Sequence, residues 1–203
     1  MFYEFKKITY EYDELGLEGL EESICEYYVA ISDKVDGENV RVGFLFFQKL
    51  NVDKAEREGH DMIYLDDHDG SLCAAYFHAL KGREYADGLF SSVLYFDKLC
   101  IYTPYRGKGR GLKALREVLT RMSRYDGDLV AVLDADPFDF TQGQGESRIE
   151  DSQRVSEGRK ALKDYYSKLS FYPVEESSSS CTMIRFVEAG RRQNGLRKRV
   201  LYW

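Results

Sequence analysis

The stretch YTPYRGKGRGLKALREVL, residues 102–119, joins a strand pattern to a helix pattern through three glycines that alternate with three cations. The alternating residues are Arg106, Gly107, Lys108, Gly109, Arg110 and Gly111. The first turn of a helix carries N–H groups without partners and the positive end of the helix dipole, so it attracts anions. Glycine lets the backbone approach a phosphate closely and turn several amides toward it. The stretch therefore predicts a phosphate-binding turn.

The segments on either side of this turn have the patterns of a strand and a helix. Residues 91–103, SSVLYFDKLCIYT, are mostly apolar and bounded by Pro104, as in a strand. Residues 109–124 repeat apolar side chains along one helical face, and LVAVL at residues 129–133 is a continuous apolar run typical of a buried strand. Because strands joined through a helix pair in parallel, we expect one parallel pair here.

The rest of the chain predicts antiparallel strands around this pair. Strand patterns occur at residues 2–10, 24–32, 39–50, 171–174 and 180–187, with a hairpin turn at Asp36 and Gly37. Helical spacing occurs at residues 12–23, at 66–79 with Asp69 or Ser71 as the cap, and at 152–169, while residues 134–148 read as a polar loop. We therefore predict an α/β fold with a mixed, mostly antiparallel sheet.

Length and composition are those of one soluble domain. The chain has 203 residues, of which 43% are hydrophobic, and no linker-like segment divides it. No apolar run approaches the roughly 20 residues of a membrane-spanning helix, and the N-terminus lacks a signal-peptide pattern, so we expect a cytoplasmic protein without membrane contact. The four cysteines lack CxxC spacing, which favours reduced core thiols.

Charge is distributed unevenly along the chain. Residues 1–38 hold 11 acids and 3 bases, whereas residues 106–124 hold 7 bases and one acid. The last fourteen residues add 5 bases and no acid. The net charge of −6 argues against a nucleic-acid-binding surface, except through this basic tail. The asymmetry predicts a phosphate-bearing ligand together with a cationic second substrate.

Two nucleotide-binding motifs are possible alternatives for the glycine-rich turn. A P-loop needs Ser or Thr after its lysine, and Gly109 follows Lys108 instead. The dinucleotide fingerprint GxGxxA does fit Gly109, Gly111 and Ala114, and Asp134 follows at the distance of a ribose-binding acid. A doubly wound domain would continue with alternating strands and helices beyond Asp134, and that alternation is missing from the sequence.

The run LCIYTPYRGKGRG resembles motif A of the GNAT superfamily of acetyl-coenzyme A dependent N-acetyltransferases, whose pattern is [RQ]xxGx[GA]. Arg106, Gly109 and Gly111 occupy its three defined positions. Downstream, YYSKLSF is similar to the family's YekLGF segment, with Tyr166 at the first position and Ser170 in place of the glycine. The other matches are Lys168, Leu169 and Phe171. The resemblance covers residues 91–187, about half of the chain.

The resemblance implies how acetyl-coenzyme A, the co-substrate, would be bound. The strand ending at Thr103 would splay from the strand at residues 129–133 and leave a cleft for the pantetheine arm. The arm would bond to the backbone of Leu99, Cys100, Ile101, Tyr102 and Thr103. The pyrophosphate would rest on the amides of Gly107, Lys108, Gly109, Arg110 and Gly111, beside Arg106. The whole chain would be one domain, with residues 1–90 on the substrate side, 91–187 as coenzyme core and 188–203 as basic tail.

The resemblance also implies direct acetyl transfer to a primary amine in a ternary complex. Tyr166 would protonate the departing thiolate, as a tyrosine at this position does in the family. For the base we favour Asp97, which is two residues from Leu99 and expected on the same strand face; Asp134 and Asp136 also lie within reach of the cleft. His60 and His68 fit no zinc spacing, so we expect no metal.

Other functions remain open at the level of the sequence. A non-catalytic acetyl-coenzyme A sensor, or an RNA- or protein-binding module on the same fold, would share the turn. The acceptor amine belongs to an unidentified small molecule or protein, and the oligomeric state is open, a homodimer included.

Overall fold

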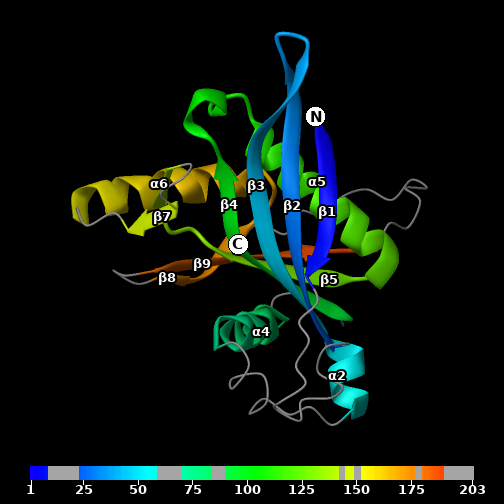
Figure 1. Ribbon diagram of the computed structural model, residues 1–203. Coiled ribbons are helices and arrows are strands. Elements are labelled where there is room, and N and C mark those ends of the chain that lie inside the picture. Colours follow the sequence, from blue (N-terminus) through cyan, green and yellow to red (C-terminus); the bar gives the residue numbers. More distant parts are fainter. Residues whose placement is uncertain are drawn as a thin grey trace, which may run out of the picture.

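Seven strands form one sheet at the centre of the computed structural model, which describes residues 1–8, 23–58, 70–83, 90–141, 145–148, 152–176 and 180–189 (Figure 1). The order across the sheet is β1-β2-β3-β4-β5-β9-β8. The strands are β1 (Phe2–Ile8), β2 (Ile24–Val35), β3 (Glu38–Asn51), β4 (Ser92–Ile101), β5 (Leu129–Asp134), β8 (Tyr172–Glu176) and β9 (Cys181–Val187).

One pair of neighbouring strands in this sheet is parallel. β4 pairs with β5 from Ser92 opposite Leu129 to Phe96 opposite Leu133, and the other five pairs are antiparallel. This confirms the predicted mixed sheet and excludes the doubly wound alternative, which needs a mostly parallel sheet. Beyond Phe96, β4 continues to Ile101 beside β3 alone within the described part of the chain. The two parallel strands therefore separate at this point.

Helices cover both faces of the sheet. On one face, α5 (Arg110–Asp126) and α6 (Ser152–Ser167) pack on a core that includes Leu94 and Leu133. On the other face, α4 (Gly70–Arg83) packs on a core that includes Val93 and Val132. α2 (Val52–Glu58) belongs to this second core through the buried side chains of Val52 and Ala55. Neighbouring residues of one strand point to opposite faces, so each helix layer has its own core.

Three local predictions were wrong or incomplete. The expected polar loop at residues 134–148 contains a hairpin of β6 (Phe138–Thr141) and β7 (Gly145–Arg148), whose alternating FDFT run has the period of a strand. α2 was not predicted, although Asn51 caps it by accepting the Lys54 N–H at 3.0 Å. α4 begins at Gly70, so Ser71 lies inside the helix and does not cap it. The helix expected at residues 12–23, apart from Ser23, and the cap expected at Asp69 fall outside the described residues.

The four cysteines are free thiols, as expected, with Cys25 half-buried and the other three buried. Among the described helices, none is both long and apolar enough to cross a membrane.

Candidate functional site

The glycine-rich turn lies between β4 and α5, where the sequence predicted it. A short 3-10 helix, Thr103–Tyr105, follows β4, and Gly109 then caps α5 with φ 66° and ψ 16°. Gly107 has φ 82°, so both residues take left-handed conformations that favour glycine. A methyl group at either position would meet nothing within 4 Å, so the outer side of the turn is open space.

Five consecutive amides of the turn are available to an anion. Among the described residues, no hydrogen-bond partner lies on the N–H groups of residues 107–111, whereas the amides on both sides are paired. The Arg106 N–H bonds to the Thr103 carbonyl at 3.3 Å, and the Lys113 N–H bonds to the Gly109 carbonyl at 3.1 Å. These five donors lie at the start of a 17-residue helix, where the helix dipole also favours an anion.

The next amide along the chain, that of Leu112, is paired with Tyr165 of α6. Its hydroxyl accepts the Leu112 N–H at 2.9 Å and lies 2.5 Å from where a methyl group on Gly111 would be. Gly111 is therefore required by close packing and not by its backbone angles, in contrast to Gly107 and Gly109. The motif contains no signal for this contact, because its two partners are 53 residues apart.

The three cations of the turn have different surroundings. Arg106 is exposed, and its Nε donates to the Ile101 carbonyl at 2.8 Å. Lys108 is exposed beside Lys113. Arg110 is 8% exposed, and its guanidinium contacts the Asp33 carboxylate at 2.7 and 2.8 Å. The side chain of Arg110 thus neutralises Asp33. Of Arg110, only the backbone amide remains for the phosphate that the sequence predicted at this turn.

A cavity of about 780 Å³ adjoins the turn. Its walls are the end of β4, the turn, the segment after β5, and α6. It brings together many of the predicted coenzyme residues, namely Leu99, Cys100, Ile101, Arg106, Gly107, Gly109, Arg110 and Gly111, and it is also lined by Tyr166. Tyr102, Thr103, Lys108 and Asp97 do not line it. Along this wall, the β4 edge that faces away from β3 has no strand partner among the described residues.

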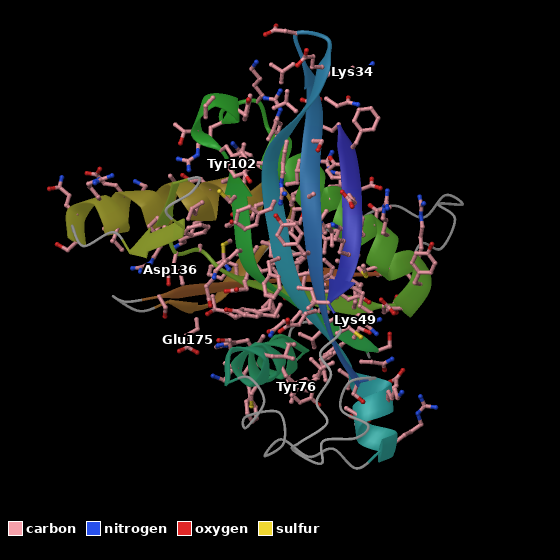
Figure 2. The ribbon with its side chains drawn as sticks, viewed as in Figure 1. Lys34, Lys49, Tyr76, Tyr102, Asp136 and Glu175 are labelled. Atoms are coloured by element: carbon pink, nitrogen blue, oxygen red, sulfur yellow. The ribbon has the colours of Figure 1, made fainter. Side chains whose placement is uncertain are left out.

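The opposite wall is held in place by contacts between α6 and the segment after β5. Arg159 binds the Asp136 carboxylate at 2.7 and 2.8 Å. A methyl group on Gly158 would lie 2.9 Å from the ring of Pro137, so the helix and the proline pack without room for a side chain. The carboxylate of Asp136, one of the alternative bases, is therefore engaged in this contact (Figure 2 labels Asp136).

Tyr166 lies at the C-terminal end of α6 and is 8% exposed. Its ring is 5.4 Å from that of Tyr165 and 6.2 Å from that of Phe171. Burial raises the pKa of Tyr166, so the hydroxyl keeps its proton at neutral pH. The helix ends in a Schellman motif, with Phe171 N–H on the Tyr166 carbonyl and Ser170 at φ 62°. This explains why glycine would fit the position of Ser170 better.

Asp97 lies where β4 is irregular. Phe96 and Asp97 together face one residue of β3, Phe47, which defines a β-bulge. The bulge shifts the alternation of β4 between Phe96 and Leu99, which both belong to the core on the α5 face. Asp97 is exposed, its carboxylate lies 3.8 Å from the Lys98 ammonium, and its charge helps to raise the pKa of Tyr95.

Asp134 is part of a separate polar group at the end of β5. Its carboxylate accepts the Thr182 hydroxyl at 2.6 Å and the Tyr95 hydroxyl at 3.3 Å. Neither Thr182 nor Tyr95 belongs to a recognisable motif, so the sequence did not single them out. Burial and the neighbouring carboxylate raise the pKa of Tyr95. The dinucleotide-binding hypothesis assigned Asp134 to the ribose of the ligand, but in the structure its carboxylate is paired with the hydroxyls of Thr182 and Tyr95.

No protein-family model matches this chain, and no curated protein matches it by sequence. Solved structures do match. An Arabidopsis thaliana NAA60 in complex with acetyl-CoA is 12% identical, with 92% of this chain and 99% of that chain covered and a TM-score of 0.43. The NatC complex bound to Gag peptide and CoA is 11% identical (80% and 70% covered, TM-score 0.38).

An N-acetyltransferase from Staphylococcus aureus Mu50 is 13% identical (79% and 69% covered, TM-score 0.37). TM-scores below 0.5 are too low to carry an assignment. The fold assignment therefore rests on the mostly antiparallel sheet and on the single parallel pair, whose strands separate as the resemblance to the GNAT superfamily implies.

Proposed function

We propose that this chain is a GNAT-type N-acetyltransferase that moves an acetyl group from acetyl-coenzyme A to a primary amine by direct transfer in a ternary complex. The observation that carries the proposal is the run of five amides at residues 107–111, which have no hydrogen-bond partner in the described part of the chain and lie next to the 780 Å³ cavity. The pyrophosphate would accept these amides, and the pantetheine arm would extend along the unpaired edge of β4 from Ile101 toward Phe96.

In this proposal Tyr166 is the general acid. The neutral amine attacks the thioester carbonyl, the C–S bond breaks, and the thiolate takes the proton of the Tyr166 hydroxyl. The raised pKa of Tyr166 keeps this proton available but also makes it a weaker acid. Burial of the thiolate in the same cavity would also raise the pKa of the thiol, which lowers the free-energy cost of this proton transfer.

Asp97 is the proposed base, as predicted from the sequence. It would receive a proton from the ammonium form of the acceptor, and it lies one residue past the point where β4 and β5 separate. Its exposed position lets the proton pass on to water. Replacing Asp97 with asparagine should shift the rise of kcat/KM toward higher pH, because the amine must then lose its proton in solution before it binds.

The test is a coupled measurement of coenzyme binding and thiol release. Calorimetry should show that acetyl-coenzyme A binds and that NAD does not, and thiol release should follow with at least one amine of a panel. Tyr166→Phe should keep the coenzyme affinity and lower kcat by about 10²- to 10⁴-fold. Absence of coenzyme binding contradicts the proposal. Tight binding without turnover on any amine favours the sensor instead.

A further inference from the structure

A second cavity, of about 250 Å³, lies on the opposite face of the sheet from the coenzyme cavity. It is lined by residues of α4 and of the neighbouring strands β4, β5 and β9, and it is open to solvent. Its walls include Tyr95 and Val132 from the core on the α4 face, whereas the coenzyme cavity is lined by Leu99 and Tyr166 from the core on the α5 face. The two cavities therefore approach the sheet from opposite sides.

The second cavity has a fixed carboxylate. Asp134 lines it and is oriented by two hydroxyls, with Thr182 at 2.6 Å on one oxygen and Tyr95 at 3.3 Å on the other. Both donors are neutral hydroxyl groups, and among the described residues no cationic side chain lies within 4.0 Å of this carboxylate. The nearby charge of Asp97, which acts on the same Tyr95 hydroxyl, adds to this field. The cavity thus attracts a cation.

The far wall is also polar. His78 of α4 lines the cavity, and its buried Nδ1 has no hydrogen-bond partner in the described part of the chain. The nearest carboxylate to this atom is that of Glu175 in β8, at 3.6 Å, which also lies 3.6 Å from the Lys81 ammonium (Figure 2 labels Glu175 beside α4). The small side chains of Ala74 and Ala75 in α4 also line the cavity and leave room for an alkyl group.

The position of Asp134 relates this cavity to the proposed reaction. The parallel pairing of β4 and β5 ends at Phe96 and Leu133, and Asp134 is the next residue of β5. A coenzyme that lies along Ile101 to Leu99 directs its thioester toward this same point, where the strands no longer hydrogen-bond to each other. For acetyl transfer, an amine in the second cavity would have to meet the thioester at the point where β4 and β5 separate.

We propose that the 250 Å³ cavity is the acceptor site and that its ligand is a small alkylamine, bound as the ammonium ion by Asp134. This inference rests on the proposed function, since it names the second substrate of the same reaction. Asp134 is a binding residue in this account, Tyr95 and Thr182 are positioning residues, and Ala74 sets the size of the accepted chain.

The experiment compares the two cavities with one substitution each of similar bulk. Ala74→Phe fills the acceptor cavity, and Ala161→Phe fills the coenzyme cavity; both alanines are exposed, so the fold should tolerate either ring. Asp134→Asn removes the charge and keeps the shape. The probes are n-butylamine, its neutral analogue 1-butanol, and acetyl-coenzyme A, with binding followed by calorimetry and turnover by thiol release.

We expect Asp134→Asn and Ala74→Phe to weaken n-butylamine by about 10- to 100-fold, in KM and in direct binding, while the coenzyme Kd changes less than about twofold. Ala161→Phe should do the reverse, and 1-butanol should not compete. The inference is overturned if the wild-type protein does not bind the amine, or if both acceptor-side variants bind it normally. Loss of coenzyme binding in the wild-type protein would instead refute the proposed function, and direct amine binding still tests the cavity in that case.

Discussion

The contact between Gly111 and Tyr165 gives the sharpest test of how the phosphate-binding turn is held. In Gly111→Ala, the new methyl group would lie 2.5 Å from the Tyr165 hydroxyl. Its next neighbours, on Leu99 and Ile101, are at 3.4 and 3.6 Å, which are ordinary contacts. The hydroxyl must therefore move away and lose its 2.9 Å bond with the Leu112 N–H.

The size of the effect follows from two opposing contributions. Loss of this bond leaves the half-buried Leu112 N–H without a partner and costs about 1–3 kcal/mol of stability. Alanine is favoured over glycine within a helix by about 0.5–1 kcal/mol. We therefore expect Gly111→Ala to lower the free energy of unfolding by about 0.5–2 kcal/mol, and Tyr165→Phe, which loses the same bond, to lower it by about 1–3 kcal/mol.

The double variant separates this explanation from a general intolerance of the turn. Once the tyrosine oxygen is absent, the alanine meets no close atom, so Gly111→Ala should raise the stability of Tyr165→Phe by about 0.5–1 kcal/mol. The coupling between the two sites should be about 1–3 kcal/mol, since one hydrogen bond is lost once and not twice.

Urea unfolding of the four proteins, followed by circular dichroism, measures this coupling. Gly109→Ala is the matched control, because its cost comes from a positive φ with open space around it and should add to that of Tyr165→Phe. If the free-energy costs of Gly111→Ala and Tyr165→Phe add in the double variant to within about 0.5 kcal/mol, the contact with Tyr165 is not the reason why position 111 requires glycine.

Three further predictions follow from single contacts. Ser170→Gly should raise the free energy of unfolding by about 1 kcal/mol, because φ 62° favours glycine, and urea unfolding that shows no gain would contradict this reading of the helix end. The Arg110 guanidinium lowers the pKa of Asp33 below its ordinary value of 3.8, so this pair should stabilise the protein above that pH and lose its effect as the pH falls through the lowered pKa. The melting temperatures of the wild-type protein and of Asp33→Asn should therefore converge in acid. A difference that stays constant with pH would contradict this role of the ion pair. Arg106→Ala should weaken coenzyme binding in calorimetry. Arg110→Met should instead lower the melting temperature and change the coenzyme affinity by less than about threefold. Equal losses of affinity in the two variants would mean that the Arg110 charge does face the ligand.

The elements around the turn were predictable because their causes are local. The apolar run of β4, the one-sided apolar repeat of α5 and the glycines between them each depend on neighbours within a few residues. The hairpin turn at Asp36 and Gly37, with φ 52° and 90°, is local in the same sense. These signals were enough to predict a strand, an anion-binding turn and a helix in that order, and hence the parallel pair.

The roles of individual side chains depend on partners that are distant in sequence. Arg110 is paired by Asp33, 77 positions away, which removes its charge from the turn. Asp97 lies in a β-bulge, which forms only when β3 and β4 pair. Tyr165 reaches the start of α5 from another helix. No local pattern contains these contacts, because each arises when separate elements pack together.

The amino-acid order alone was thus sufficient for the mixed sheet and for the location of the glycine-rich turn, since backbone conformation and apolar periodicity are encoded residue by residue. Tertiary packing was needed to show which amides stay open, which cations are already neutralised, and that Asp134 lines a cavity on the opposite face. The reason is that hydrogen bonds and charge compensation depend on distances between elements, and these distances exist only in the folded chain.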